Sequence, residues 1–322
     1  MKKFSALFLS LLLLIGLLVG CGQTNNAEQK ENNSNASEQT SKLFPVTVKD
    51  ALGEDVTIKE KPKRIVSLIP SNTEIVYTLG LGDQIVGVTE LDNYPEEVKN
   101  KEKVGDMNFN VEKIISLKPD LVLAHASSAA NAKEGLNQLK EAGITVFVVE
   151  NATSFEQVYQ TIQTIGKITG TKEKADEIVQ NMKTKVNELK EKAKNITDAE
   201  KQKVFVEISA PPQLYTTGKG TFMDEMLAII NAENAAGDQE GWPQITEEAV
   251  VKLNPDTIII TYGNYVENAT EQVLGRKGWE NVTAIKEKRV YEVNEDLVSR
   301  PGPRLVEGVE ELAKAVYPDV FE

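Results

Sequence analysis

SFEQVYQTIQTIGKITGTKEKADEIVQNMKTKVNELKEKAKNI spans residues 154–196 of the 322-residue chain. This stretch is helical in pattern throughout and is interrupted only near Gly170. Its second part, Lys172–Lys194, is rich in Lys, Glu and Ala, which favour helix. Because no strand pattern occurs within it, the stretch predicts a long helical segment, assigned to residues 154–200, that connects two other parts of the chain.

Short apolar or β-branched runs alternate with helical patterns on the N-terminal side of this segment. The runs that predict strands are 64–68, 85–88, 121–124 and 145–149, with helical patterns such as 72–79 and 132–142 between them. Before these runs, alternation over 46–50 and 55–59 predicts a hairpin. Strands that alternate with helices indicate a parallel sheet covered on both faces.

The same alternation resumes after the helical segment. Its elements are 204–208, 221–230, 257–261, 289–293 and 303–316. A chain of 322 residues also exceeds the usual size of one compact core. The predicted fold class is therefore α/β, with lobes at residues 45–153 and 201–322 joined by a single long helix.

The N-terminus has the pattern of a bacterial lipoprotein leader. Two lysines precede an apolar run, residues 4–20, which is short for a membrane span. The run ends in LVGC, residues 18–21, which resembles a lipobox. We therefore expect residues 1–20 to be a signal peptide and Cys21 to be lipidated, for example with palmitate.

A polar stretch follows this cysteine. Residues 22–42 contain no aromatic or branched aliphatic side chain, so they cannot bury a core. Residues 21–44 are predicted to form a flexible tether that holds the folded part near the extracellular face of the cell membrane.

Charge and residue counts exclude several classes of protein. The net charge of −13 makes nucleic acid an improbable partner. Cys21 and His125 are the only cysteine and histidine, so no disulfide forms within one chain and a dedicated transition-metal site is disfavoured. Nucleophilic catalysis by a Ser-His or Cys-His pair is improbable for the same reason. The 49 acidic residues leave a carboxylate-based extracellular hydrolase open as a distant alternative.

Two further patterns concern helix starts. Residues 217–221, TGKGT, lack the glycine spacing of a phosphate loop and predict a turn into the next helix.

A pattern of four residues occurs twice with identical spacing, as Glu112, Leu117, Pro119, Asp120 and as Glu248, Leu253, Pro255, Asp256. Asn110 or Thr246 stands two places before each glutamate, which predicts that both glutamates lie in the first turn of a capped helix. Stabilisation of the helix dipole would by itself explain why a glutamate stands at each of these two positions.

Several blocks resemble the substrate-binding proteins of iron-siderophore and cobalamin ABC importers. They are RIVSLIPSNTE (64–74), LGLGD (79–83), VGV (86–88), NYP (93–95) and LKPDLV (117–122). The resemblance runs from about Asp50 to the C-terminus. It implies two Rossmann-like lobes, a connecting helix and a ligand held between the lobes without chemistry on it.

Residues 210–219, 242–244 and 296–304 are similar to the cobalamin-binding branch. The resemblance implies that Tyr215 and Trp242 are aromatic faces against the corrin, and that Asp296 and Arg300 contact its amide-bearing edge. A flat, amphipathic ring system suits aromatic platforms with a few orienting polar groups.

Three more residues are candidate ligand contacts. Ser71 and Asn72 lie at a strand-to-helix junction, where backbone groups commonly contact ligands. His125 and Leu91 stand where relatives place aromatic residues. His125 is either a residue that faces the ligand or a satisfied polar residue, and no metal ligand is expected among these side chains.

The family also assigns a role to the repeated glutamates. One glutamate on each lobe docks on arginines of the permease, and Glu112 and Glu248 match those positions. The implied partners are an ABC permease, its ATPase and the membrane, with the protein itself a monomer that carries no cofactor.

The expected cargo is cobalamin, with a ferric siderophore or haem as the alternative. Anionic siderophores require clustered bidentate donors, and the chain has only five arginines. A single connecting helix also predicts little closure on the ligand.

Overall fold

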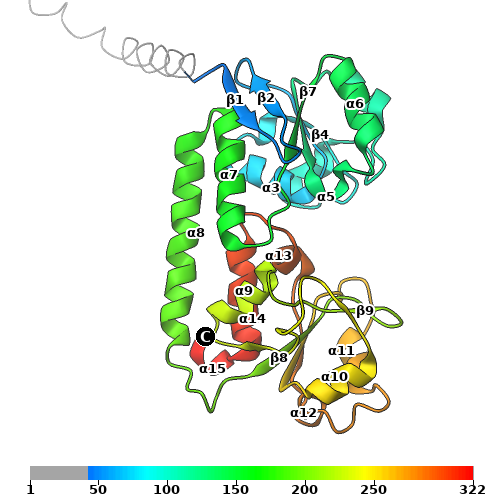
Figure 1. The fold of residues 1–322 in the computed structure, drawn as a ribbon, viewed down its shortest axis with the longest axis vertical. Helices are drawn as coiled ribbons and strands as arrows, with labels where there is room; N and C mark the ends of the chain where they lie inside the picture. Colours follow the sequence, from blue (N-terminus) through cyan, green and yellow to red (C-terminus); the bar gives the residue numbers. More distant parts are fainter. Residues whose placement is uncertain (1–42, 322) are drawn as a thin grey trace, which may run out of the picture.

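A computed structural model describes residues 43–321 and shows two α/β lobes beside a pair of long helices (Figure 1). The predicted α/β fold class is confirmed. The expected signal peptide, Cys21 and all but the last two residues of the predicted tether lie outside the described residues. Within the described range, no helix combines the length and apolar character needed to cross a membrane.

The N-terminal lobe is built on a five-stranded parallel sheet of order β5-β4-β3-β6-β7. Its strands are β3 (Ile65–Ser67), β4 (Ile85–Val88), β5 (Glu102–Lys103), β6 (Leu121–His125) and β7 (Thr145–Val149). An antiparallel hairpin, β1 (Val46–Lys49) and β2 (Asp55–Ile58), precedes it. The helices are α3 (Pro70–Thr78), α4 (Val111–Ser116), α5 (Ala126–Ala129) and α6 (Lys133–Glu141), with 3₁₀ turns at Gly82–Gln84 and Glu96–Asn100. The four predicted strands and the hairpin are confirmed, and the structure adds β5, whose two residues are too short to carry a pattern.

The C-terminal lobe repeats the plan with a four-stranded parallel sheet of order β10-β8-β12-β13. The strands are β8 (Lys203–Glu207), β10 (Glu233–Asn234), β12 (Thr257–Ile260) and β13 (Val290–Glu292), and a separate antiparallel pair joins β9 (Leu214–Tyr215) to β11 (Gln244–Ile245). The helices are α9 (Phe222–Ile229), α10 (Glu247–Leu253), α11 (Ala269–Leu274), α12 (Thr283–Lys286), α13 (Glu295–Ser299), α14 (Leu305–Val316) and α15 (Pro318–Phe321).

Helices α7 (Phe155–Thr169) and α8 (Lys172–Ala193) connect the lobes. They lie side by side, and α8 runs from the N-terminal lobe to the C-terminal lobe (Figure 1). The turn between them needs Gly170, whose φ of 69° is left-handed. A side chain at Gly166 would meet Ala175, so a glycine there lets the two helices approach closely.

One hydrophobic core runs through both lobes. It includes Ile65 of β3, Ile162 of α7, Met182 of α8 and Leu305 of α14. Separate clusters fill the outer part of each lobe, around Val122 in one and around apolar residues of the C-terminal sheet in the other. Because the lobes share a core through α7 and α8, a large hinge motion would expose apolar surface.

The repeated four-residue pattern is a structural repeat. Asn110 and Thr246 cap α4 and α10 through their side chains, as predicted. The residue after each leucine, Lys118 or Asn254, has a positive φ of 48° or 46°. The carboxylates of Asp120 and Asp256 then accept backbone N–H groups at the start of the neighbouring strand, from Arg64 and Lys203 among others.

Candidate functional site

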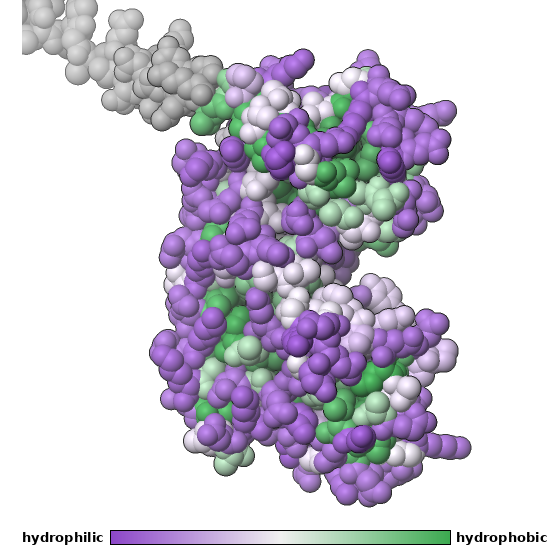
Figure 2. All heavy atoms as spheres, in the orientation of Figure 1, coloured by the Kyte–Doolittle hydropathy of each residue, from purple (hydrophilic) through white to green (hydrophobic). Residues whose placement is uncertain are grey.

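A hollow separates the two lobes (Figure 2). At its inner end is a cavity of about 270 Å³ lined by residues from both lobes: Ile69, Pro70, Ser71, Leu91 and Asn93 from one, and Tyr265, Glu295, Asp296, Ser299, Arg300 and Pro301 from the other. All of these residues follow the carboxyl ends of parallel strands β3, β4, β12 and β13. Ligands of α/β proteins bind at such strand ends.

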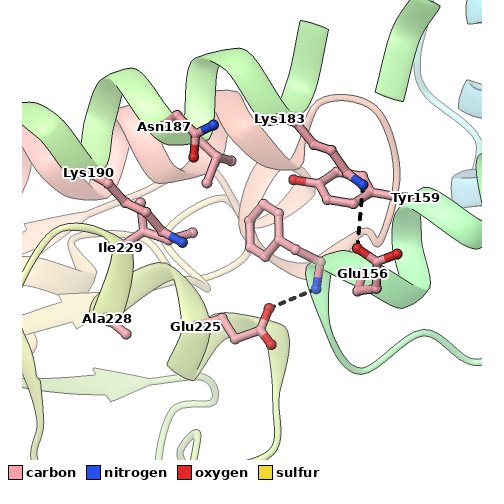
Figure 3. Close-up of a pocket in the computed structure, with 10 residues that line it drawn as sticks. Glu156, Tyr159, Lys183, Asn187, Lys190, Glu225, Ala228 and Ile229 are labelled. Atoms are coloured by element: carbon pink, nitrogen blue, oxygen red, sulfur yellow. Dashed lines mark hydrogen bonds and ion pairs between the residues drawn. The ribbon is translucent and has the colours of Figure 1, made fainter. Parts of the chain in front are cut away.

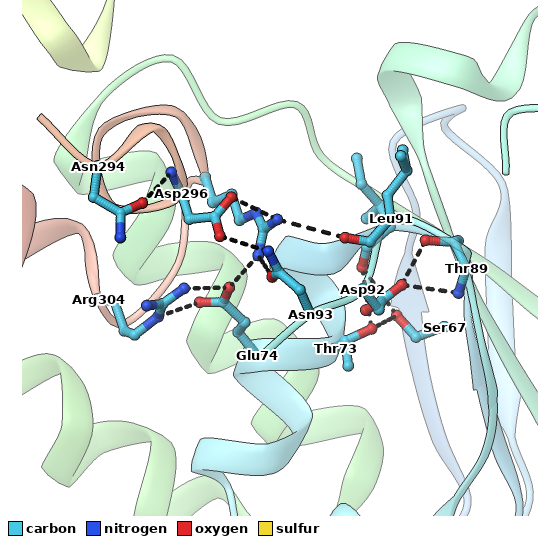
Figure 4. Close-up of polar contacts among 12 residues, drawn as sticks. Ser67, Thr73, Glu74, Thr89, Leu91, Asp92, Asn93, Asn294, Asp296 and Arg304 are labelled. Atoms are coloured by element: carbon cyan, nitrogen blue, oxygen red, sulfur yellow. Dashed lines mark hydrogen bonds and ion pairs between the residues drawn. The ribbon is translucent and has the colours of Figure 1, made fainter. Parts of the chain in front are cut away.

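A polar network crosses from one lobe to the other beside this cavity (Figure 4). Glu74, on α3, accepts hydrogen bonds from Arg304 at 2.9 and 2.8 Å and from Arg300 at 2.9 Å. Asn93 donates to Asp296 at 2.8 Å and accepts from Arg300 at 2.7 Å. Arg300 also pairs with Asp296 at 2.7 Å. These contacts join the loop after β4 and helix α3 to the segment that contains α13.

The network is largely buried and contains as many carboxylates as guanidinium groups. The side chain of Glu74 is 2% exposed, and those of Arg300 and Arg304 are each 14% exposed. Such a group of charges is tolerable only because each is paired. The Tyr94 ring also stacks 3.8 Å from the Arg304 guanidinium carbon.

Hydrogen bonds to the Asp92 side chain fix the loop that carries Leu91 and Asn93. The Asp92 carboxylate accepts from the backbone N–H of Thr89 at 2.8 Å and from the Thr89 hydroxyl at 2.5 Å. Burial raises the pKa of Asp92 above its ordinary value, against the opposing effect of these hydrogen bonds. The loop is thus fixed where it meets the opposite lobe.

Ser71, Asp296 and Arg300 are brought together at the cavity, as residues that line it. Asn72 is buried instead and donates to the backbone oxygen of Ala124 at 3.1 Å, which ties α3 to β6. The side chain of Asn72 therefore has a structural contact, whereas Ser71 borders the cavity.

His125 is 3% exposed and does not line the cavity. Its Nδ1 lies 2.8 Å from the Ser127 hydroxyl and accepts from the Ser127 N–H at 3.3 Å, so the imidazole caps α5. Burial lowers the pKa of His125, which favours the neutral ring. In this conformation the imidazole could reach a ligand only by leaving its cap.

Tyr215 and Trp242 are exposed on the β9–β11 pair, outside the lining of the cavity, with 37% and 43% of their surfaces accessible. Tyr215 is paired with Gln244 in register, and Trp242 precedes that residue by two positions. Trp242 therefore lies in the bend just before β11, near the strand pair that carries Tyr215. The Trp242 ring lies edge-on to Phe222, with 5.6 Å between ring centroids.

Sequence reasoning missed Tyr265 and Glu74. Tyr265 lines the cavity and is 74% exposed, and the neighbouring Glu295 carboxylate raises its pKa. Its place just after strand β12 was a usable signal, since strand ends face the cleft. Glu74 carried no such signal, because the neighbouring sequence does not reveal that a residue in the middle of a helix contacts two arginines of the other lobe.

Glu112 and Glu248 are exposed in the first turns of α4 and α10, one on each lobe. Glu248 also lines a groove of about 650 Å³ beside Pro212, Leu214 and Gln244. Neither glutamate is needed as a cap, because Asn110 and Thr246 perform that function.

A second groove, of about 570 Å³, lies among α7, α8 and α9 and shares no lining residue with the interlobe cavity (Figure 3). The backbone N–H of Phe155 donates to Glu225 at 2.7 Å, which fastens the start of α7 to the C-terminal lobe. Lys183 pairs with Glu156 at 3.6 Å and lies 4.8 Å from the centre of the Tyr159 ring. Burial raises the pKa of Tyr159 to about 12, so its hydroxyl stays protonated.

Across residues 43–321, no three His, Cys, Asp or Glu side chains gather closely enough to hold a metal ion. All five arginines lie in this range, and each already has a protein partner. Arg64 donates to Leu117 O, Arg276 to Glu207, Arg289 to Gln202, and Arg300 and Arg304 to Glu74.

A family model described as periplasmic binding protein matches residues 65–297. The chain is 55% identical over 322 residues, all of both chains, to the uncharacterized ABC transporter substrate-binding lipoprotein YvrC of Bacillus subtilis. It is 30% identical over 282 residues to a cobalamin-binding protein of Halobacterium salinarum, which covers 85% of this chain and 74% of that one. A solved structure of a possible iron-binding, periplasmic solute-binding protein of Staphylococcus epidermidis matches with a TM-score of 0.72 and 40% identity, covering 80% of this chain and all of the other.

Proposed function

Because the chain belongs to the periplasmic binding protein family and is the substrate-binding protein of an ABC importer, we propose that its cargo is cobalamin. Members of this family are substrate-binding proteins and not enzymes, so the carboxylate-based hydrolase is set aside. The protein would capture the ligand between its lobes and deliver it chemically unchanged to a permease.

The observation that carries this proposal is the charge balance of the cleft. Arg300 lines the interlobe cavity and Arg304 shares its partner Glu74, so the two guanidinium groups are neutralised by Glu74 and Asp296. An anionic siderophore or the propionates of haem would need unpaired guanidinium groups as bidentate donors. A ligand ringed by neutral amides needs only hydrogen-bond donors and acceptors, which Asn93, Asp296 and Arg300 supply together.

Aromatic residues supply the second element of the proposed site. Tyr215 on β9 and Trp242 just before β11 present exposed rings, and Tyr265 presents a third at the cavity. A corrin is flat and amphipathic, so rings that expose their faces at the cleft suit it. Ser71 would add backbone contacts at the start of α3.

The relative from Halobacterium salinarum supports cobalamin by its name. The Staphylococcus epidermidis structure, titled as possibly iron-binding, favours the alternative, a ferric siderophore or haem. The neutralised arginines weigh against that alternative.

We further propose how the protein meets its partners. Glu112 and Glu248 would each pair with an arginine of the permease, one on each lobe. Two charge pairs far apart set orientation more than affinity. Cys21 would carry the lipid that anchors a monomer to the extracellular face of the cell membrane.

Isothermal titration of residues 22–322 tests the cargo. The ligands are cyanocobalamin, haem, a ferric hydroxamate and a ferric catecholate. We expect tight one-to-one binding of cyanocobalamin alone. Binding of a siderophore or haem alone would keep the transport role and replace the cargo. No detectable binding of any of the four ligands would contradict the proposal.

A further inference from the structure

We propose that Glu74 determines which ligand charge the cleft accepts, because it neutralises Arg300 and Arg304 and so keeps anionic groups out of its inner end. This inference rests on the proposed function in one respect, that the interlobe cavity is the ligand site. It adds a specificity-determining residue that acts through the two arginines without touching the ligand.

The position of Glu74 is unusual for a charged residue. It lies in the middle of α3, a helix whose residues from Pro70 to Val76 are all buried. Glu74 is the only charged residue of that helix. A carboxylate buried in this way carries a high desolvation cost unless it is fully hydrogen-bonded.

Both carboxylate oxygens of Glu74 are in use. Oε1 accepts from Nη1 of Arg300 and Nη2 of Arg304, and Oε2 accepts from Nε of Arg304. The arginines come from a segment more than two hundred positions away in the chain. The carboxylate is therefore the counter-ion of two guanidinium groups from the opposite lobe.

The charges around the cavity can be summed. Arg300 and Arg304 are opposed by Glu74 and Asp296, and Glu295, which lines the cavity, adds a further carboxylate. This set therefore contains one more carboxylate than guanidinium group. An anion entering beside Arg300 therefore meets a carboxylate excess, at short range and partly out of water, where charge interactions are strong.

Substitution of Glu74 by Gln removes that excess while it keeps the shape and a hydrogen-bond acceptor. Arg304 then loses its carboxylate partner, and Arg300 keeps only Asp296. The cleft of E74Q should tolerate an anionic ligand that the natural protein rejects.

The test compares two ligands of nearly identical shape. One is cyanocobalamin, and the other is its monocarboxylic acid derivative, in which one side-chain amide is hydrolysed to a carboxylate. We expect the natural chain to bind the amide at least about tenfold more tightly than the acid, and E74Q to reduce that ratio about tenfold. Haem, which carries two propionates, is titrated in parallel by its absorbance, and E74Q should bind it about tenfold more tightly than the natural chain.

Two control variants separate charge from shape. E74Q/R304Q restores the charge balance without the carboxylate, so discrimination against the acid should return. E310Q removes a carboxylate from a surface ion pair with Lys185, so it changes net charge equally but should leave the ratio unchanged. If E74Q does not fold, D296N frees Arg300 from its other partner, and the amide-to-acid ratio is measured on that variant.

An unchanged ratio in E74Q and D296N would overturn the inference, as would a double variant that still accepts the acid. If the chain does not bind cyanocobalamin but E74Q gains affinity for haem, the inference stands while the proposed cargo fails. If cyanocobalamin binds and the ratio does not move, only the inference fails. If no variant binds cyanocobalamin or haem, both the inference and the proposed cargo fail.

Discussion

Glu74 and Arg304 lie on different lobes, yet two hydrogen bonds of 2.9 and 2.8 Å join them. With Arg300 and the Asn93–Asp296 contact, they connect the lobes at the inner end of the cleft. This connection adds to the core that the lobes share through α7 and α8.

Replacement of Glu74 by Ala should lower the free energy of unfolding by about 3–5 kcal/mol, because the largely buried Arg304 loses its carboxylate partner and Arg300 loses one of two. Replacement of Glu310 by Ala breaks the exposed pair with Lys185 and should cost about 1 kcal/mol or less. Urea unfolding measured by circular dichroism compares the two. Equal effects would mean that the interlobe network contributes no more than a surface ion pair.

Ligand binding should change the overall dimensions of the protein very little. Opening the lobes would break the Glu74 ion pairs and expose part of the shared core. X-ray scattering of the free and cobalamin-bound protein should therefore give nearly superimposable curves. A large compaction on binding would contradict this expectation.

Substitution of Trp242 or Tyr215 by Ala should weaken cobalamin binding at least about tenfold, because each removes an exposed aromatic platform. The fold should be little affected, since both rings are substantially exposed. Tyr215→Phe keeps the ring and should keep the affinity. Titration calorimetry measures all three variants, and unaltered binding by both Ala variants would place the ligand elsewhere.

The double variant E112A/E248A should lose uptake while its ligand affinity stays intact. The matched control is E134A/E271A, which removes acidic residues from the first turns of α6 and α11, one in each lobe. Both doubles lose the same helix-dipole stabilisation, but only the first loses the proposed contacts with the permease. Cobalamin uptake by cells distinguishes them, and normal uptake by E112A/E248A would leave the glutamates a purely structural role.

His125 should make the protein less stable below neutral pH. Burial lowers its pKa in the folded state from the ordinary value of 6.5. The unfolded chain therefore binds a proton at a higher pH than the folded chain does. The contribution of His125 to stability is thus full above pH 6.5, falls as the pH drops towards the lowered pKa, and changes no further below it.

Urea unfolding from pH 8 to pH 5 tests this, with His125→Asn as the comparison. Asparagine can still cap α5 but does not titrate. The difference in unfolding free energy between the two proteins should shift against the natural chain as the pH falls. A constant difference would show that the imidazole titrates normally.

Local chemistry accounts for what could be predicted from the sequence. The apolar runs of β3, β6 and β7 and the helical stretch around Gly170 depend on side-chain periodicity and backbone preference, which neighbouring residues decide. The caps Asn110 and Thr246 act over three residues, and the structure confirms both. The two-residue strands β5, β9, β10 and β11 escaped prediction because they exist only through their partners.

Only the tertiary structure decided the inner end of the cleft. The sequence by itself determined an α/β chain of two lobes around a long helix and placed Ser71, Asp296 and Arg300 among the candidate contacts. It could not pair Glu74 with Arg300 and Arg304, 226 and 230 positions away, or show that His125 is a buried cap. The reason is physical: periodicity acts within a few residues, whereas the partner and the burial of a charged group depend on which distant elements the folded chain brings together.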